Sequence, residues 1–340
     1  MRKLRIVVLI HKGLLPPNSK KGFKEKEIEE WRVEYDVIST LNKLGHTVKP
    51  VEMYGELTPL REALDEFKPH IAFNLLEEFY DFPVFDQQVV SYLELKKIPY
   101  TGCNPRGFII AKDKALSKKI LFYHDIKTPE FKVFPSRKKA KENHKYEFPL
   151  FVKSISDEGS VGITKKSLVR SFKELKERVE FIHKNSKTAA IAEQFVEGRE
   201  IYVGIIGNEA LTVFTPWELH FTKDKNSTPI ATSNVKWSKK HQKRLGVVTK
   251  AAKLSGKLNK ELINTSKKIF KILMLSGYAR LDFRITPNNG IYFIEANANP
   301  YLAKDEDFAQ SALHFGHSYK DLLKKIINTG LNNSKQTFRA

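Results

Sequence analysis

The residues with the clearest chemical potential stand in one short segment near the end of the chain. RLDFR at 280–284 is followed by PNNG at 287–290 and by YFIEAN at 292–297. Residues two apart in a strand face the same side, so Arg280 projects with Asp282, and Glu295 with Asn297. Asn-Gly is a strong hairpin signal, and a hairpin would bring these four side chains to one surface.

Such a surface would offer hard oxygen ligands beside a guanidinium. The carboxylates of Asp282 and Glu295 and the amide oxygen of Asn297 suit Mg²⁺ or Mn²⁺, whose remaining ligands come from water and phosphates. Arg280 could then stabilise an anionic intermediate. The solvated edge of a sheet, carrying ordinary ion pairs, is an alternative of about equal weight.

Two further segments could contact a nucleotide. EGSVG at 158–162 follows a strand-like run that ends in Lys153. Its backbone N–H groups could cradle phosphate, although a surface hairpin is the more common meaning of such a loop. EQFVEGRE at 193–200 places Glu193 and Glu200 on either side of a turn, beside apolar residues. An adenosine site needs apolar faces and an acid for the ribose, but a segment of this kind is more often a charged strand end.

The elements that must position these residues begin with a strand-helix alternation. Strands are expected at 4–10, 47–53 and 70–76, with a helix from 28 that Gly45 ends and another at 60–67. This order predicts a parallel sheet that binds ligands beyond its carboxyl ends, at 12–26 and 77–88. Later we expect helices at 112–123, 168–183 and 261–275 and strands at 150–153, 190–195, 201–206, 278–285 and 290–296. A polar, Lys-rich stretch runs from 223 to 260.

The composition excludes several classes of protein. With 340 residues, 41% of them hydrophobic, the chain predicts a globular protein of about two to three domains. The single Cys103 excludes an internal disulfide and favours a reducing compartment. No apolar stretch approaches the ~20 residues of a membrane span, so we expect a cytoplasmic protein without a membrane partner. P-loop and Gly-x-Gly-x-x-Gly motifs are missing as well.

The net charge of +20 leaves a nucleic-acid-binding protein as an alternative of another class. Nucleic-acid sites combine basic residues with aromatic ones on one face. The basic runs at 137–145 and 236–244 contain few aromatic residues, so solvated surface is the favoured interpretation.

In this order the motifs resemble the ATP-grasp superfamily, and most closely its D-alanine–D-alanine ligase-like branch. The resemblance extends from the first strand to about Leu323 and is most specific at 280–300. It implies an α/β fold with an N-terminal Rossmann-like domain at 1–110, a central ATP-grasp lid domain at 111–215 and a C-terminal catalytic domain at 216–330. It also implies an ATP-dependent ligase that joins a carboxylate to an amine through an acyl phosphate. Relatives are often homodimers through the N-terminal domain.

The resemblance assigns roles to individual residues. Lys114 and Lys153 look like the lysines that hold the α- and β-phosphates of ATP, and Lys236 like the lysine near the γ-phosphate. Glu193 with the backbone of Phe195 and Val196 resembles the adenine site, and Glu200 the ribose ligand. Ser160 and Gly162 belong to the loop over the phosphates. Asp282, Glu295 and Asn297 resemble the magnesium ligands, and Arg280 the arginine that faces the acyl phosphate.

Two segments depart from the ligase pattern. NLLEEF at 74–79 replaces a His-Gly…Gly-Glu-Asp-Gly segment, and NPY at 299–301 followed by KDEDF at 304–308 replaces a Pro-Gly and a serine that receives a substrate carboxylate. Both places belong to the substrate sites of the family, so we expect substrates other than D-alanine.

The candidate substrate residues are Glu34, Glu77, Glu78 and Tyr301. The three glutamates could receive a substrate ammonium, while a solvated helix face is an equal alternative for Glu34. The substrates are expected to be small carboxylates and amines. A peptide or protein acceptor with acidic character, attracted by the basic surface, is the alternative.

Overall fold

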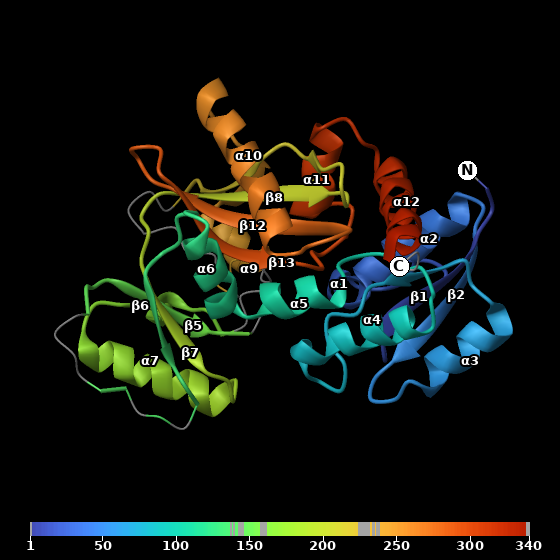
Figure 1. Ribbon diagram of the computed structural model, residues 1–340, viewed down its shortest axis with the longest axis horizontal. Coiled ribbons are helices and arrows are strands. Elements are labelled where there is room, and N and C mark those ends of the chain that lie inside the picture. The colour runs from blue at the N-terminus through green and yellow to red at the C-terminus, as the bar shows by residue number, and fades with distance from the viewer. Residues whose placement is uncertain are drawn as a thin grey trace.

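The computed structural model describes residues 2–136, 138, 140–141, 146–156, 162–223, 232, 235 and 239–337. Figure 1 shows a parallel sheet at one end of the molecule and two further sheets at the other end. This arrangement agrees with the predicted α/β fold.

The parallel sheet has the strand order β2-β1-β3, formed by Thr47–Met53, Arg5–His11 and Ile71–Asn74. In β1, Ile6 and Val8 pack in one cluster with α2 (Arg32–Lys43), while Val7 and Leu9 pack in another with α3 (Thr58–Phe67) and α4 (Asp86–Leu95). A run buried on both faces is typical of a parallel strand covered by helices. The expected parallel sheet is thereby confirmed.

The helix expected from residue 28 to Gly45 is in fact two. α1 (Glu25–Glu30) ends at Trp31, where α2 begins, and Gly45 follows the end of α2 in the left-handed region with φ +82°. The break turns α1 away from the sheet, so that α1 buries none of its residues.

The last helix, α12 (Tyr319–Thr337), returns to the parallel sheet. Its residues Leu322 and Ile326 are buried in the same cluster as Ile6, Val8 and Phe73. Figure 1 shows α12 beside α2. Part of the sequence range predicted for the third domain therefore covers the N-terminal sheet.

The central sheet has the order β4-β7-β5-β6, formed by Phe131–Phe134, Ala190–Gln194, Leu150–Ser154 and Leu168–Val169. α7 (Phe172–Asn185) packs on it. The prediction of a helix at 168–183 was wrong at its start, because Leu168 and Val169 pair with β5. The helix begins only after Ser171, whose hydroxyl accepts a hydrogen bond from the Glu174 N–H.

Two helices link the parallel sheet to the central one. These are α5 (Pro105–Lys112) and α6 (Lys114–Tyr123). Elsewhere, short 3₁₀ helices lie before α4 at Pro83–Phe85 and before β6 at Lys165–Ser167. The expected helix at 112–123 begins two residues later than predicted. Asp113 causes this start, because its carboxylate accepts hydrogen bonds from the N–H groups of Ala115 and Leu116, both at 2.9 Å.

The third sheet is antiparallel and has the order β11-β10-β8-β12-β13, with β9 (Thr212–Val213) beside β8. Its strands are Val247–Ala251, Trp217–Phe221, Arg199–Ile206, Tyr278–Ile285 and Ile291–Asn297. α10 (Gly256–Ile272) packs with Val203 and Leu281 in one cluster, whereas Phe308 of α11 (Asp307–His314) packs with Ile206 in another.

The polar, Lys-rich stretch from 223 to 260, to which the sequence assigned no element, contains secondary structure. Its described part contains α9 (Lys239–Leu245), β11 and the start of α10. β11 pairs along its whole length with β10, yet its residues alternate between half-buried and exposed. Half-buried strands rich in Lys and Thr carry a weak sequence signal.

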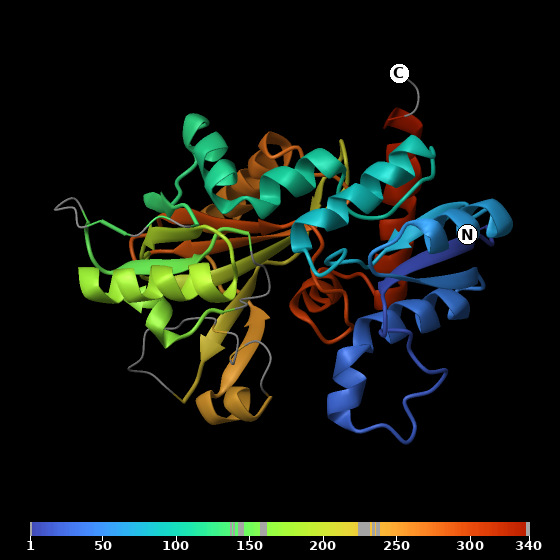
Figure 2. The same ribbon diagram turned by 90° about the horizontal axis from the view of Figure 1, so that it is seen from below.

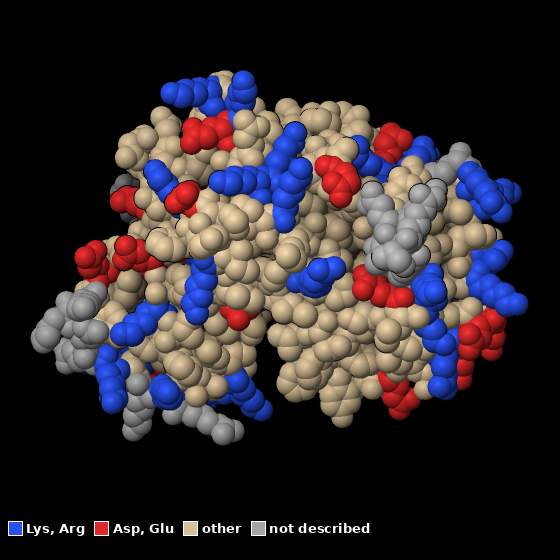
Figure 3. Space-filling model, viewed as in Figure 1, with Lys and Arg blue, Asp and Glu red and all other residues tan. Residues whose placement is uncertain are grey.

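Among the described residues, no helix is at once long and apolar enough to cross a membrane. The face seen in Figure 3 carries Lys and Arg over both ends of the molecule, interspersed with Asp and Glu. The basic runs at 137–145 and 236–244 lie partly outside the described residues.

Candidate active site

The hairpin of β12 and β13 forms as the Asn-Gly signal predicts. Asn289 adopts the left-handed conformation with φ +64°, and the Thr286 N–H donates to the Gly290 carbonyl at 3.0 Å. Arg280 stands directly opposite Asn297, and Asp282 opposite Glu295. The prediction that one hairpin gathers these side chains is confirmed.

Arg280, Asp282 and Asn297 are bonded to one another. The Arg280 guanidinium donates to both oxygens of Asp282 at 2.8 and 2.9 Å, and Asn297 Nδ2 donates to Oδ2 at 3.3 Å. The Arg280 and Asp282 side chains are 14% and 7% exposed, which excludes the solvated edge. Burial opposes the charge of Arg280, but the Asp282 carboxylate outweighs burial and raises the pKa of the guanidinium.

Lysine side chains from α6 and β5 surround the other carboxylate of the hairpin. Lys153 Nζ lies 3.2 Å from Glu295 Oε2, and Lys114 Nζ lies 3.9 Å from the same atom. Lys153 also lies 3.3 Å from Glu193 Oε2, at the end of β7. The structure thus brings together both lysines that were predicted to hold phosphates.

Lys118 completes this network and was missed by the sequence reasoning. It stands one helical turn after Lys114, on the same face of α6, and its Nζ lies 2.9 Å from Glu193 Oε1. Lysines spaced four apart in a helix usually indicate an exposed face. The signal that could have revealed this one is its spacing of four residues from Lys114, which was itself a predicted phosphate ligand.

Burial and charge act on the network in opposite directions. Burial lowers the pKa of Lys118 to about 8. For Lys153, burial is outweighed by the carboxylates of Glu193 and Glu295, which raise its pKa. For Glu193, burial is outweighed by Lys118 and Lys153, which lower its pKa. The Glu193 carboxylate is therefore engaged by two ammonium groups.

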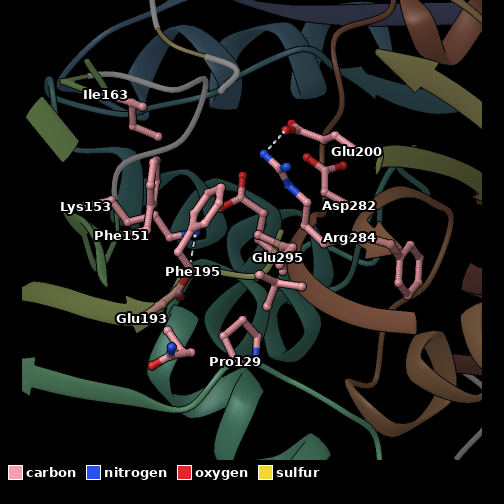
Figure 4. A pocket seen from close by; sticks show the side chains of 14 residues that line it. Pro129, Phe151, Lys153, Ile163, Glu193, Phe195, Glu200, Asp282, Arg284 and Glu295 are labelled. Atoms are coloured by element: carbon pink, nitrogen blue, oxygen red, sulfur yellow. Dashed lines mark hydrogen bonds and ion pairs between the residues drawn. The ribbon is translucent and has the colours of Figure 1, made fainter. Parts of the chain in front are cut away.

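A pocket of about 650 Å³, here called the nucleotide pocket, opens between the central and third sheets. Predicted site residues that line it are Lys153, Glu193, Phe195, Val196, Glu200, Asp282 and Glu295. Figure 4 shows the rings of Phe151 and Phe195 close together, and their centroids lie 6.4 Å apart. Glu200 accepts a hydrogen bond from Arg284 at 2.8 Å.

The turn between β7 and β8 is fixed by two close approaches. The Phe195 N–H donates to the Pro149 carbonyl at 3.1 Å. Gly198 has φ +146°, and a Cβ at this position would lie 2.1 Å from the Ile285 carbonyl oxygen. A glycine is required here because the backbone passes so close to the end of β12.

Only part of the glycine-rich loop lies within the described residues, and the lysine predicted near the γ-phosphate does not. Ser160 and Lys236 lie outside the described residues. Gly162 has φ +70°, and its carbonyl accepts a hydrogen bond from the Arg178 guanidinium of α7. Ile163, the next residue, lines the nucleotide pocket.

A second pocket of about 1380 Å³ lies farther along the same face of the hairpin. Arg280 and Asn297 line it, together with residues of α1, α9, β10 and β11. In Figure 2, the blue helix α1 and the yellow and orange strands β10 and β11 face each other in the lower part of the view. The four hairpin residues border both pockets, Asp282 and Glu295 the first and Arg280 and Asn297 the second.

Two of the four candidate substrate residues line this second pocket. Glu77 and Tyr301 line it. Glu34 is 6% exposed and thus not on a solvated face; burial, helped by the Glu77 carboxylate, raises the pKa of Glu34 to about 7. Glu78 instead faces His11 at 3.4 Å and lies within 4.8 Å of the Asp81 carboxylate as well.

Arg32 is a further residue of the second pocket that the sequence reasoning missed. It is 8% exposed and contacts Asp305 at 2.5 Å, Glu306 at 3.2 Å and also Glu29. Two of these partners lie more than 270 positions away in the sequence. Separation of this size leaves no local signal.

Comparisons with known proteins identify the family. The family model described as "D-ala D-ala ligase C-terminus" matches residues 119–328. A D-alanine–D-alanine ligase of Aquifex aeolicus is 32% identical over 299 residues, 86% of this chain and 92% of the relative. An uncharacterised protein of Sinorhizobium fredii is 28% identical over 87% of both chains.

The fold is shared with solved ligase structures. The crystal structure of D-alanine–D-alanine ligase from Bacillus anthracis complexed with ATP has a TM-score of 0.75 at 23% identity and covers 98% of this chain and 99% of its own. A D-Ala:D-Ser ligase from Enterococcus faecalis has a TM-score of 0.69 at 17% identity, with 97% and 100% coverage. With its sequence relatives and its fold in agreement, the chain belongs to the D-alanine–D-alanine ligase-like family of ATP-grasp proteins, which are ATP-dependent carbon–nitrogen ligases.

Proposed function

We propose that this ligase uses ATP to convert a carboxylate into an acyl phosphate and then transfers the acyl group to an amine. The observation that carries the proposal is that neighbouring residues on one face of the hairpin border both pockets. Asp282 and Glu295 line the nucleotide pocket, and their neighbours Arg280 and Asn297 line the second pocket. A phosphate at one wall and an acyl group at the other would meet at these residues.

The nucleotide pocket offers a suitable place for each part of ATP. Phe151 and Phe195 supply apolar faces for the base, and Glu200 supplies an acceptor for the ribose hydroxyls. Lys114 and Lys153 supply the positive charge for the phosphates. The carboxylates that now hold these lysines keep their ammonium groups in place for an anionic ligand.

Asp282, Glu295 and Asn297 fit a magnesium or manganese ion in the chemistry of their donors. Two carboxylates and one amide oxygen are hard ligands, and the strand register brings them together. Arg280 and Lys153 hold the two carboxylates in place. When bound, such an ion would offset the charge that develops on the phosphates.

The remaining chemistry falls to the residues of the chain. The carboxylate oxygen of the acid substrate attacks the γ-phosphorus, the bond to the ADP oxygen breaks, and an acyl phosphate forms. The amine nitrogen then adds to the acyl carbon, phosphate leaves, and the proton of the amine passes to the departing phosphate. Arg280 faces the pocket where the oxyanion of this second step develops.

We infer that the substrates are not D-alanine. Tyr301 fills a position where the family pattern has glycine, and it lines the second pocket beside Arg32. Its neighbours Asp305 and Glu306 bind that arginine. The second pocket thus combines Arg280 and Asn297, which match the family pattern, with residues of the two segments that depart from it.

The test is a screen for ADP release over pairs of carboxylates and amines, with mass measurement of the product. We expect Glu295→Ala to abolish magnesium-dependent ADP release. The matched change Glu66→Ala, at an exposed position of α3, should leave ADP release unchanged. ADP release that persists in Glu295→Ala would contradict the assigned metal site. ATP binding without turnover for any small pair would direct the search to a peptide or protein acceptor.

A further inference from the structure

We propose that Tyr202 is a positioning residue that connects ribose recognition in the nucleotide pocket with the placement of Arg280 in the second pocket. This inference rests on the proposed function and deepens it, because it says how the residues assigned to ATP and to the reacting groups are held relative to one another. Tyr202 lies in β8 and is 3% exposed. Its hydroxyl and its ring contact different parts of the candidate site.

The register of the third sheet places Tyr202 between these two parts. Glu200 and Tyr202 are two apart in β8, so both face the same side of the sheet. Arg284 of β12 lies opposite Glu200, and Asp282 lies opposite Tyr202. Arg280 is the next residue of β12 on this face. The row from Arg284 to Arg280 thus runs from the nucleotide pocket to the second pocket, with Tyr202 beside its middle.

The hydroxyl of Tyr202 orients the carboxylate that is assigned to the ribose. It donates a hydrogen bond to Glu200 Oε1 at 2.8 Å, while the Arg284 guanidinium donates to Oε2, also at 2.8 Å. Figure 4 shows the second of these contacts. A carboxylate oxygen accepts two hydrogen bonds, so each oxygen of Glu200 retains a position for a ribose hydroxyl. With a donor on each oxygen, the carboxylate has a fixed orientation in the nucleotide pocket.

The hydroxyl of Tyr202 keeps its proton in these surroundings. Burial raises its pKa well above the ordinary value, and the carboxylates of Glu200 and Asp282 raise the pKa further, although Arg280 opposes them. A carboxylate only accepts hydrogen bonds, so it needs a partner that brings a proton. Tyr202 is therefore the donor in its contact with Glu200.

The ring of Tyr202 contacts the guanidinium of Arg280. The guanidinium carbon lies 4.8 Å from the ring centroid. A cation over an aromatic face is attracted by the ring, and most strongly where water is excluded. Asp282 accepts two hydrogen bonds from the same guanidinium, so that Arg280 is held both by this carboxylate and by the ring. Tyr202 itself lines the second pocket.

One stiff side chain thus contacts a functional residue of each pocket. A tyrosine has only two rotatable side-chain bonds, so its hydroxyl and its ring move together. A shift of Glu200 that displaced the hydroxyl would also displace the ring beneath Arg280. The position of the ribose ligand and the position of the arginine that faces the reacting groups therefore depend on the same residue.

Two substitutions separate the hydroxyl from the ring. Tyr202→Phe removes only the hydroxyl, and we expect the KM for ATP to rise about 10-fold while kcat changes less than about 2-fold. Tyr202→Leu removes the ring as well, and its kcat should be about 10-fold below that of Tyr202→Phe. Steady-state ADP release measures both constants. An unchanged KM for ATP in Tyr202→Phe, or equal kcat values in the two variants, would overturn the inference.

Tyr100→Phe is the matched control. Tyr100 is 5% exposed, pairs with Ala72 of the parallel sheet and donates through its hydroxyl to Glu94 Oε1 at 2.7 Å. The change removes the same kind of tyrosine–glutamate hydrogen bond in another part of the fold. We expect kcat and the KM for ATP to stay at their wild-type values. An equal rise of this KM in Tyr100→Phe and Tyr202→Phe would show that a general loss of stability, and not positioning, is the cause.

A binding measurement separates this inference from the proposed function. Calorimetric titration compares ADP with 2′,3′-dideoxyADP, which lacks both ribose hydroxyls, and needs no turnover. We expect the wild type to bind ADP at least about 10-fold more tightly, and Tyr202→Phe to retain less than about a third of this preference. No preference in the wild type, or the same preference in Tyr202→Phe, would overturn the inference and leave the ligase chemistry standing.

The expected binding without ADP release for any pair of substrates would instead contradict the ligase chemistry. A double-mutant cycle in urea titrations then decides the role of the ring. Tyr202→Leu and Arg280→Met remove the two sides of the same contact, so the double variant should lose less stability than the sum of the single variants. Additive losses would contradict the support of Arg280 by the ring.

Discussion

Lys118 Nζ of α6 lies 2.9 Å from Glu193 Oε1 of β7, and the two side chains are 0% and 4% exposed. Glu193 reaches with its other oxygen to Lys153, which lines the nucleotide pocket. This buried ion pair thus connects α6, which also carries Lys114, to β7, which borders the nucleotide pocket.

Replacement of Lys118 tests how much this ion pair contributes to stability. Lys118→Met leaves one buried oxygen of Glu193 without its donor while Lys153 still pairs with the other, so we expect it to lower the free energy of unfolding by about 1–3 kcal/mol in urea titrations. The change Lys119→Met, on the exposed side of the same helix, should cost less than about 1 kcal/mol. Equal losses in the two variants would show that the pair contributes nothing to stability.

The two arginines of β12 should affect different kinetic constants. Arg280 lines the second pocket and Arg284 the nucleotide pocket, where it holds Glu200. We expect Arg280→Lys to lower kcat about 10²–10³-fold with little change in the KM for ATP. Arg284→Lys should instead raise the KM for ATP. Steady-state ADP release at varied ATP measures both, and a rise of the ATP KM in Arg280→Lys would contradict its assigned role.

Gly198 should not tolerate a side chain. With φ +146° and a Cβ only 2.1 Å from the Ile285 carbonyl, Gly198→Ala must displace the turn that presents Phe195 and Glu200. We expect a lower Tm and a higher KM for ATP. Gly256→Ala is the matched control, since its Cβ meets nothing within 4 Å and alanine favours the start of α10. Similar behaviour of the two variants would show that the close approach is unimportant.

Glu34 should make the protein less stable as the pH rises. Its pKa in the folded state is about 7, above the ordinary 4.5, so between these values the native state binds more protons than the unfolded state. The free energy of unfolding then falls as the pH rises through this window, by up to about 3 kcal/mol. Glu34→Gln has no carboxyl group to ionise and so does not lose stability in this window. Its Tm should exceed that of the wild type at pH 8 but not at pH 4.5. A constant difference between these pH values would refute the shift.

The hairpin could be predicted from the sequence because all of its determinants are local. Asn289 and Gly290 make the turn, and alternation along the two flanking strands selects the face. The register then follows, so that the pairing of Asp282 with Glu295 needs no information from elsewhere in the chain. The central part of the candidate site was accessible for this reason.

Other parts of the site depend on contacts between distant segments. Lys118 becomes a buried residue only because β7 brings Glu193 against α6. Arg32 brings Glu29 of α1 together with Asp305 and Glu306 from the segment before α11. In the sequence these charged residues look like ordinary solvated side chains. Nothing in the sequence indicates which of them form ion pairs with one another.

The position of α12 also bears on how the protein is made. One face of β1 and β3 is covered partly by α2 and partly by Leu322 and Ile326, which follow the two strands by about 250 to 320 positions. During translation α2 can cover its part of that face early, but the part under Leu322 and Ile326 stays open until α12 emerges. The earliest part of the chain to be made is thus among the last to reach its native state.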